Sequence, residues 1–473
     1  MGKHHMSGKL KTIFITLSSP NVYRNLFFFP ESVFFKLKAA VLQDPALRVV
    51  IVAPKKDFQK YTAALGMHLG DRLVLEAAPP VTVQNFLQKL FYFFYSYLIY
   101  TGTTRTLATL GVRPDEPPAG GKRYLAPVKI LIAHTFGKIS WVKKRAVPWI
   151  FARLFPGVGF LALFEKYQPS LVFVGHLYGL FDTALVALAR RRTIPTSGMI
   201  SNWDHFDKYY LPVQVERLFA QSDQIKDLAI TYQSYHPDQI TVVGYPHIDF
   251  ITDSRYAVSR GQLLSELGFP TNAKYILYIS GSAYCPDEPD TIEKILEWAD
   301  TGALGGDVRL VIRPYLGGRG ADRDFDEKKY NRFEEHPRVV FYRREFWGDL
   351  ERSIQFINIM RHADAVISIY STAVLEAAAL DRPLVGIGFD GYHERPFNHS
   401  IRRFTLREHF QDVLKSGAVT IAQNFEDLGQ TLKEYIADPA RDREARQRMV
   451  ARLCYKTDGK ASERLVEFLT SAV

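Results

Sequence analysis

The first half of the chain alternates short apolar runs with segments of helical pattern. The earliest apolar runs are residues 11–17 (KTIFITL) and 47–54 (LRVVIVAP), and a helical pattern covers residues 179–192. Further runs follow with the sequences DRLVLEA, SLVFVGH, TIPTSGMI, RLFAQS and ITVVGYP. Continuous runs rich in β-branched residues are typical of parallel strands that are buried on both faces. The pattern therefore predicts an α/β domain with a doubly wound parallel sheet.

A second array of the same kind begins after a polar, helix-like stretch at residues 254–267. Its apolar runs are KYILYIS, DVRLVIRP, RVVFYR, DAVISIYS and RPLVGIGF, again separated by helical segments. A chain of 473 residues is long for one core and suits two domains of about 200 residues each. We expect two Rossmann-like domains, at residues 9–248 and 268–455, followed by a C-terminal helix at 456–473.

Ligands of open parallel sheets bind beyond the carboxyl ends of the strands, so the residues directly after each apolar run are the informative ones. In the second array, Ser371 and Thr372 follow a strand and open a helix. Their hydroxyls and the free amide groups of the helix start favour an anion such as a diphosphate. The alternative is a simple helix N-cap that needs no ligand.

Other strand-end residues of the second array extend this candidate site. Glu376 lies one helical turn beyond Thr372, where its carboxylate can accept hydrogen bonds from ribose hydroxyls. Arg313 supplies a positive charge for phosphate, and Gly281 lets the backbone approach a ligand closely. The set favours a nucleotide site made of Ser280, Gly281, Ser282, Arg313, Ser371, Thr372 and Glu376.

Several of these segments carry a family resemblance. ISIYSTAVLEAAALDRPLVGIGF, YISGSAY and VRLVIRP, with the earlier SNWDHFDKYY and ITVVGYPHIDF, resemble GT-B glycosyltransferases of bacterial surface-polysaccharide synthesis. That group is related in fold to CDP-glycerol glycerophosphotransferases and nucleotide-sugar 2-epimerases. The resemblance covers most of the chain beyond Ser170. One departure is that Arg313-Pro314 is followed by Tyr315, where related polymer-forming transferases often have His-Pro.

The resemblance implies a GT-B fold in which two Rossmann-like domains face a cleft. The C-terminal domain would bind a nucleotide-sugar donor and the N-terminal domain a saccharide or lipid-linked acceptor. It also implies that no metal ion and no cofactor take part, because basic side chains and a helix terminus neutralise the leaving diphosphate. We expect an inverting glycosyltransferase. A polyol-phosphate transferase using a CDP-alcohol, a 2-epimerase and a catalytically inactive assembly partner are the alternatives.

The first half should supply the acceptor contacts and the general base. His176 directly follows the run LVFVG, and a histidine of ordinary pKa near 6.5 suits proton abstraction from a hydroxyl. Asp204 lies in a polar and aromatic loop and is the second candidate for the base. The alternatives are a structural histidine for His176 and a turn or helix cap for Asp204. Expected acceptor contacts are Asn21, Arg24, Asn202, Trp203 and His205, with Asn25 beside them.

The net charge of +10 indicates an anionic partner, and its distribution favours a membrane surface over nucleic acid. No acidic residue occurs between Glu116 and Glu165. That stretch interleaves aromatic residues with Lys122, Arg123, Lys129, Lys138, Lys143, Lys144, Arg145 and Arg153. A solvated face of an amphipathic helix is the alternative. The apolar run at residues 90–100 is too short to span a bilayer and predicts an interfacial helix or a core or dimer helix.

Other chemistries find little support in the sequence. The two cysteines, Cys285 and Cys454, have no metal-site spacing. Phosphate-loop and nucleophile-elbow motifs are absent. Asp322, Asp324 and Asp326 are spaced like metal ligands but fall in a segment expected to be a solvated loop, and His393-Glu394-Arg395 is a charged cluster that would lie near the donor or in a surface loop. Without a signal-peptide pattern, we expect a cytoplasmic protein on the inner face of the cytoplasmic membrane.

Overall fold

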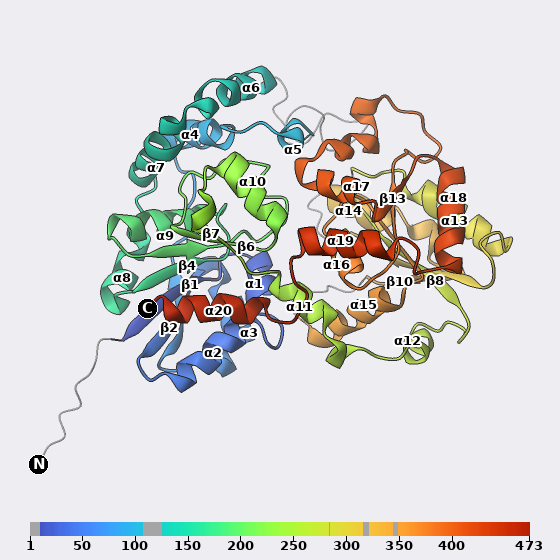
Figure 1. Ribbon diagram of the computed structural model, residues 1–473, viewed down its shortest axis with the longest axis horizontal. Coiled ribbons are helices and arrows are strands. Elements are labelled where there is room, and N and C mark those ends of the chain that lie inside the picture. Colours follow the sequence, from blue (N-terminus) through green and yellow to red (C-terminus); the bar gives the residue numbers. More distant parts are fainter. Residues whose placement is uncertain (1–9, 107–124, 283, 316–320, 344–348) are drawn as a thin grey trace, which may run out of the picture. The chain divides into compact units, whose positions relative to one another are not determined.

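The computed structural model describes residues 10–106, 125–282, 284–315, 321–343 and 349–473. The chain forms two compact units (Figure 1). Unit 1 contains Met1–Tyr100, Val128–Phe250 and Tyr455–Val473, and unit 2 contains Thr101–Pro127 and Ile251–Cys454. The chain therefore leaves unit 1 twice and returns to it with its last segment.

Unit 1 is built on a seven-stranded sheet with the order β3-β2-β1-β4-β5-β6-β7. Every neighbouring pair is parallel, and Ile13 of β1 lies beside Val49 on one side and Leu171 on the other. The doubly wound sheet predicted from the apolar runs is confirmed. Its strands are β1 (Lys11–Thr16), β2 (Leu47–Pro54), β3 (Leu73–Ala78), β4 (Leu171–Val174), β5 (Thr196–Gly198), β6 (Arg217–Ala220) and β7 (Ile240–Val242).

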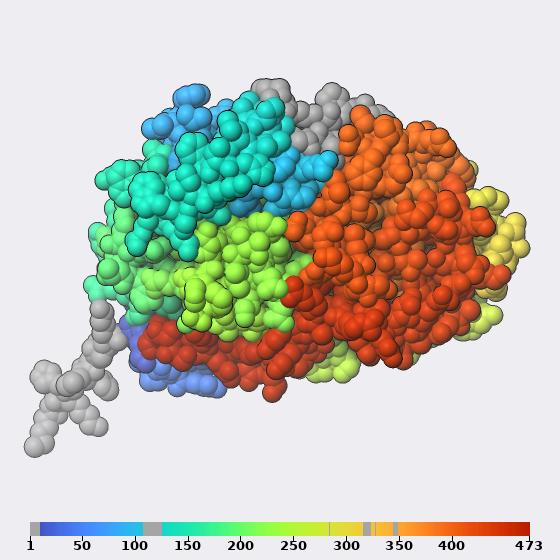
Figure 2. Space-filling model, turned by 45° about the horizontal axis from the view of Figure 1, so that its top comes forward, coloured from blue at the N-terminus to red at the C-terminus, as the bar shows by residue number. Residues whose placement is uncertain are grey.

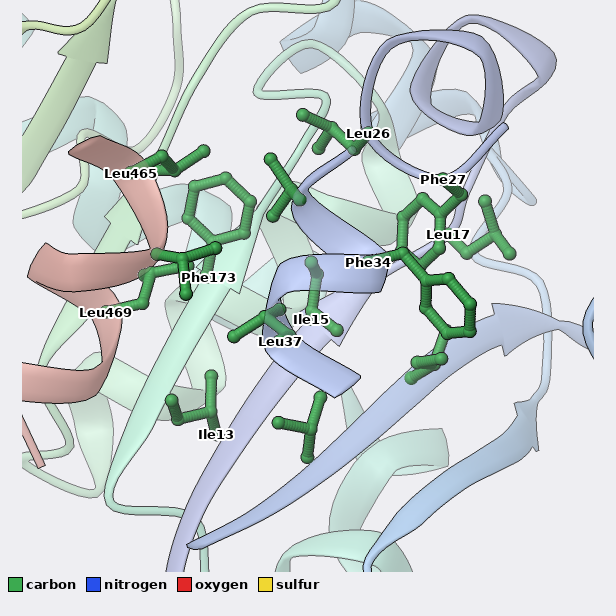
Figure 3. Close-up of a cluster of buried hydrophobic side chains, with 14 of the residues drawn as sticks. Ile13, Ile15, Leu17, Leu26, Phe27, Phe34, Leu37, Phe173, Leu465 and Leu469 are labelled. Carbon is green, nitrogen blue, oxygen red and sulfur yellow. The ribbon is translucent and has the colours of Figure 1, made fainter. Parts of the chain in front are cut away.

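Helices cover both faces of this sheet, as continuous apolar strands require. The C-terminal helix α20 (Ala461–Ser471) packs beside α2 (Val33–Gln43). Figure 3 shows Leu465 and Leu469 of α20 close to Phe173 of β4, in one buried cluster with Ile13 and Leu37. The other helices placed wholly in unit 1 are α1 (Pro20–Leu26), α3 (Phe58–Leu65), α4 (Phe86–Ser96), α7 (Val147–Leu154), α8 (Leu161–Tyr167), α9 (Leu180–Arg191) and α10 (Asp223–Gln233).

A group of helices stands outside the sheet layers of unit 1. Helices α4, α6 (Ala126–His134) and α7 lie together in Figure 1. A π-helical turn, Val142–Ala146, leads into α7. Pro148 follows this turn and has no amide hydrogen, so the regular hydrogen bond to Lys144 cannot form and the helix is locally widened. Among the described helices, no single one is long and apolar enough to cross a bilayer. One pair of helices, bent by 66° at a short break, is long and apolar enough when its two members are taken together.

Unit 2 is built on a six-stranded parallel sheet with the order β10-β9-β8-β11-β12-β13. The second Rossmann-like array predicted from the sequence is confirmed. Its strands are β8 (Lys274–Ile279), β9 (Val308–Arg313), β10 (Val339–Phe341), β11 (Ala365–Ser368), β12 (Leu384–Ile387) and β13 (Val419–Ala422). Its helices are α5 (Gly102–Arg105), α12 (Arg260–Glu266), α13 (Glu288–Asp300), α14 (Ala321–Lys328), α15 (Leu350–His362), α16 (Ala373–Ala379), α17 (Gln411–Ser416), α18 (Phe425–Ala437) and α19 (Arg443–Leu453), while α11 (Pro246–Thr252) spans the change of unit at Phe250.

The buried face of α20 predicts that this helix stabilises unit 1. Leu469 is fully buried, and a Leu→Ala change in a core costs about 2–5 kcal/mol. We expect Leu469→Ala to lower the thermal unfolding midpoint by several degrees, measured by circular dichroism. Glu467→Ala changes an exposed position of the same helix and serves as the control. Equal midpoints for both variants would show that α20 is not part of the cooperative core.

Candidate functional site

In unit 1 the order of strands reverses between β1 and β4, which are neighbours at the centre of the sheet. From β1 the chain builds outward to β3 on one side, and from β4 it builds outward to β7 on the other. Ligands of such sheets bind at the carboxyl ends of the strands beside this reversal. His176 lies there, directly after β4, and the segment that leads into α1 lies there after β1.

His176 is held in a defined orientation at this place. Its Nδ1 lies 2.7 Å from the hydroxyl of Ser201. Burial lowers the pKa of His176 to about 4 because the charged imidazolium loses its hydration. The ring is therefore neutral at pH 7, as a general base must be before it acts, and it is a weaker base than an ordinary imidazole.

The loop after β5 carries the predicted cluster from Asn202 to His205. The indole of buried Trp203 donates a hydrogen bond of 2.6 Å to Gln224, so its polar group anchors the loop to α10. Asp204 forms an ion pair with Lys208. Nε2 of His205 lies 3.2 Å from the amide of Asn202, and burial lowers the pKa of His205 to about 3. All four predicted side chains are thus engaged with neighbours, and His205 is neutral.

Helix α1 brings its polar residues to the same loop. The side-chain amide of Asn25 donates a 2.8 Å hydrogen bond to the carbonyl of Ser201. Arg24 donates to Asn25 over 3.0 Å, and Asn21 is partly exposed in the first turn of the helix. The structure therefore brings Arg24, Asn25 and the Ser201 loop together. Asn25 acts as the tie between them.

Asp182 belongs to this site and was missed from the sequence. It is fully buried in the first turn of α9, and its Oδ1 accepts a 2.5 Å hydrogen bond from Thr16 at the end of β1. Its Oδ2 has no hydrogen-bond partner among the described residues. Burial, opposed by Ser18 and Thr16, raises the pKa of Asp182 to about 7. A carboxylate inside the apolar run LFDTALVALA was the available signal.

Asp182 and His176 flank the same backbone position. A Cβ atom on Gly179 would stand 2.8 Å from Oδ2 of Asp182 and 2.9 Å from Cδ2 of His176. A side chain at residue 179 would therefore displace one of these two groups. Glycine is required here because the acid and the histidine close in on the backbone from both sides.

In unit 2 the corresponding reversal lies between β8 and β11. After β8, the hydroxyl of Ser280 accepts a 2.9 Å hydrogen bond from the amide of Tyr315. The amide of Gly281 donates to Glu288 over 2.8 Å, and the hydroxyl of Ser282 donates to Asp326 over 3.0 Å. These contacts fix the loop in one conformation. They also engage the Gly281 amide with protein.

A buried network of charged side chains stabilises the loop after β8. Lys329 lies 2.7 Å from Glu288 and 3.4 Å from Asp326, and all three side chains are almost fully buried. The prediction of a solvated loop is wrong for this segment, since Ala321–Lys328 is the helix α14 and Asp326 is enclosed. Asp326 acts as a partner of a lysine and a serine. Sequence spacing alone could not reveal the serine, which lies 44 residues away, whereas Lys329 lies only three residues beyond Asp326.

The turn after β11 contains the predicted phosphate-binding pair. The hydroxyl of Ser371 lies 2.9 Å from that of Ser368 and accepts a 3.3 Å hydrogen bond from the amide of Ala373. Thr372 occupies the N-cap position of α16, but its side chain makes no capping hydrogen bond in the described part of the chain. Tyr370, with φ of +47°, is buried against the rings of Phe404 and Phe410. The capping alternative therefore fits Ser371 and does not fit Thr372.

Glu376 and Arg313 form an electrostatic pair in this region. Glu376 is 8% exposed on α16, and Arg313 ends β9 with its guanidinium 4.6 Å from the ring centre of Phe356. Burial lowers the pKa of Arg313, and the negative charge of Glu376 opposes that shift. The two predicted donor contacts are thus close enough to stabilise each other's charge.

The charged cluster at His393 offers three groups of the kind that bind metal ions. Ligand atoms of Asp287, Asp290 and His393 lie within 4.8 Å of one another. However, Arg395 forms a close ion pair with Asp287. The guanidinium neutralises one of the two carboxylates, which weakens the attraction for a cation.

Comparisons with known proteins place this geometry in a wider context. Residues 329–471 match the family model described as CDP-Glycerol:Poly(glycerophosphate) glycerophosphotransferase. UDP-GlcNAc 2-epimerase from Neisseria meningitidis, solved with UDP-GlcNAc bound, is 13% identical, with a TM-score of 0.54 over 98% of this chain and 100% of that one. A glycosyltransferase from Rickettsia africae is 9% identical, with a TM-score of 0.51 over 98% and 99%. No curated protein sequence matches this chain.

These similarities confirm the predicted fold and its relationships. The structure is a two-domain α/β protein of the GT-B type, similar to glycosyltransferases and to nucleotide-sugar 2-epimerases. The family match includes the turn with Ser371 and Thr372 and the helix with Glu376. The matched family is described as a glycerophosphotransferase, and the similar solved structures show the fold.

The raised pKa of Asp182 predicts a pH-dependent stability. Its pKa is about 7 in the folded protein and 3.8 ordinarily. The folded state thus binds the proton more tightly than the unfolded state. The resulting contribution to the free energy of unfolding is complete below pH 3.8 and is lost as the pH rises toward 7. The loss is at most about 1.4 kcal/mol per pH unit. Asp182→Asn should therefore gain in unfolding midpoint relative to the unmodified protein between pH 5 and pH 8. The control is Asp238→Asn at an exposed carboxylate. Parallel pH curves for Asp182→Asn and the unmodified protein would contradict the prediction.

Proposed function

We propose that this protein is a transferase that moves a group from a nucleotide-activated donor to a hydroxyl of an acceptor. The observation that carries the proposal is His176, a neutral imidazole held by Ser201 at the carboxyl end of β4. Such a group removes a proton from a hydroxyl as the oxygen attacks. In unit 2, Arg313 and the turn at Ser371 and Thr372 provide the groups suited to a leaving diphosphate.

For a nucleotide-sugar donor, the steps follow from these groups. His176 accepts the proton of the acceptor hydroxyl while its Nδ1 stays bonded to Ser201. The oxygen attacks the anomeric carbon, the bond from that carbon to the diphosphate breaks, and the nucleoside diphosphate leaves with the electron pair. Attack opposite the leaving group inverts the anomeric centre. Arg313 and the backbone amides near Thr372 stabilise the departing charge without a metal ion.

Asp204 is the weaker of the two candidates for the base. Its carboxylate is already engaged in an ion pair with Lys208. His176 lies directly at the strand end and needs no change of partner to accept a proton. We therefore assign Asp204 to orienting the acceptor through Lys208.

A CDP-alcohol is the second candidate donor, and the family match over residues 329–471 favours it. In that reaction the acceptor oxygen would attack the phosphorus that carries the alcohol. The bond between this phosphorus and the bridging oxygen would break, and CMP would leave with that oxygen and the electron pair. The same base and the same phosphate contacts would serve. The donor is therefore the first property to measure.

Donor binding should raise the thermal stability of the protein, because a ligand that binds only the folded state stabilises it by about 2.7 kcal/mol at one hundred times its dissociation constant. We expect one family among UDP-, GDP-, CMP- and dTDP-sugars to raise the unfolding midpoint in a thermal-shift screen. Glu376→Ala should raise the ligand concentration needed for the same shift at least tenfold. Glu444→Ala, at an exposed glutamate of unit 2, should leave that concentration unchanged. A shift with CDP-glycerol alone would select the second candidate, and no shift with any donor would overturn the proposal.

We also propose that the protein works at the inner surface of the cytoplasmic membrane. Exposed large apolar side chains concentrate between residues 83 and 158. In this region they are Val83, Phe86, Leu87, Leu90, Tyr92, Val128, Ile130, Leu131, Phe136, Ile139, Trp141, Trp149 and Val158. Soluble proteins rarely expose so many apolar side chains together, and such patches mark interaction surfaces. We name these residues the apolar face.

Basic side chains accompany the apolar face. The described residues from 77 to 164 include no acidic residue, while Lys138, Lys144, Arg145 and Arg153 are basic. The guanidinium of Arg153 lies 3.5 Å from the ring centre of Trp149, which is 59% exposed. Aromatic and basic side chains side by side suit the headgroup region of an anionic bilayer. Lys122 and Arg123 lie outside the described residues.

The apolar face makes membrane binding only partly sensitive to salt. We expect the protein to co-sediment with phosphatidylglycerol vesicles. The binding should weaken in about 0.5 M salt, where the Debye length is only a few ångströms, but it should persist because salt does not screen apolar contacts. Trp149→Ser combined with Leu131→Ser should reduce binding about tenfold or more. Tyr392→Ser, at an exposed aromatic residue of unit 2, is the control. Binding that is equal in both variants, or absent from these vesicles, would contradict the membrane assignment.

A further inference from the structure

Helix α4 belongs to the apolar face at its beginning and to the interior of unit 1 at its end. Phe86, Leu87 and Leu90 are exposed in its first turns. Tyr95 and Ser96, in its last turn, are buried and line a cavity of about 240 Å³ together with Tyr92. Figure 2 shows the outer surface of this region, in light blue and teal, beside the green part of the chain. One helix thus connects a surface suited to lipid with an internal space.

The cavity has the size and the lining of a site for a small hydroxyl-rich group. Sites for drug-sized ligands measure about 300–1,000 Å³, so this one suits a single sugar or polyol unit. Besides the α4 residues, its lining includes His176, Tyr178, His205, Lys208 and Tyr209. Tyrosine rings offer apolar surface and a hydroxyl that donates and accepts, a combination that matches the faces and edges of a sugar.

His205 contributes a neutral polar side chain to the lining of the cavity. This side chain is 9% exposed, and its Nδ1 has no hydrogen-bond partner among the described residues. A buried nitrogen left without a partner destabilises the folded protein. Burial also raises the pKa of Tyr209 and of Tyr92, so both hydroxyls keep their protons and can donate.

The cavity reaches the reacting group of the proposed function. His176 forms part of its wall, with its Nδ1 already bonded to Ser201. A hydroxyl that enters the cavity therefore meets the neutral histidine. Lys208, also in the lining, carries Asp204 as its ion-pair partner, so the wall contains no isolated charge that would exclude a neutral sugar.

We propose that this cavity binds the terminal sugar or polyol unit of an acceptor carried by a membrane lipid. The apolar first turns of α4 contact the lipid side, and the last turn holds the hydroxyl-bearing unit beside His176. The proposal rests on the proposed function for the role of His176. The binding itself requires no donor, so it is measured separately.

Octyl β-glucoside below its micelle concentration is the probe, because it joins a sugar head to an apolar tail. Glucose and octanol are the two further arms, and binding is measured by isothermal titration calorimetry on the full chain. We expect octyl glucoside to bind at least tenfold more tightly than glucose or octanol. Tightest binding of glucose would favour a soluble saccharide and overturn the lipid-borne acceptor.

Variants separate the cavity from general adsorption to the apolar face. His205→Phe and Tyr209→Phe remove polar groups with little change of volume and should each weaken octyl glucoside binding about tenfold. Tyr392→Phe, far along the sequence in unit 2, should leave it unchanged. Octyl glucoside that binds both cavity variants as tightly as the unmodified protein, or no more tightly than octanol, would refute the site. Because no nucleotide is present, a failed donor screen leaves this result interpretable.

Discussion

Burial of parallel strands on both faces is the constraint on which the rest of this structure depends. The central strands of each sheet, such as β1 and β8, are buried at every position after their first residue. Helices on both faces leave no open sheet surface for chemistry. Polar groups can therefore gather only at the strand ends, and the reversal of strand order at the centre of each sheet leaves room for them there.

The same burial sets the protonation of the groups at those ends. His176 and His205 are neutral because their charged forms would lose hydration, and Asp182 holds its proton up to about pH 7 for the same reason. In unit 2, by contrast, buried groups at the strand ends stay charged. Lys329 and Glu288 are both enclosed and stabilise each other as an ion pair within 2.7 Å. At these strand ends, unit 1 thus holds neutral histidines and a protonated acid, whereas unit 2 holds a buried ion pair.

The helices at residues 83–158 follow a different rule from the sheets. They expose apolar side chains that the sheet layers would have buried, and the basic residues among them have no acidic neighbours in the described sequence. Exposing such a surface to water is unfavourable in free energy, and contact with an apolar partner removes this penalty. Helix α4 links this surface to the cavity at His176, so membrane contact and acceptor binding would depend on one element.

The sequence by itself determined the two parallel sheets, the strand-end position of His176 and the turn at Ser371, because apolar runs and their ends are local signals. The partners of these residues were decided by the tertiary structure. Asp182 meets Thr16 across 166 residues, and Asp326 meets Ser282 across 44, so neither the buried acid nor the enclosed helix α14 could be read from spacing. Exposure along α4 was equally hidden, since apolar and aromatic residues occur along its whole length. Only packing decided which of them face the interior and which face outward, because hydrophobicity alone does not say what covers a side chain.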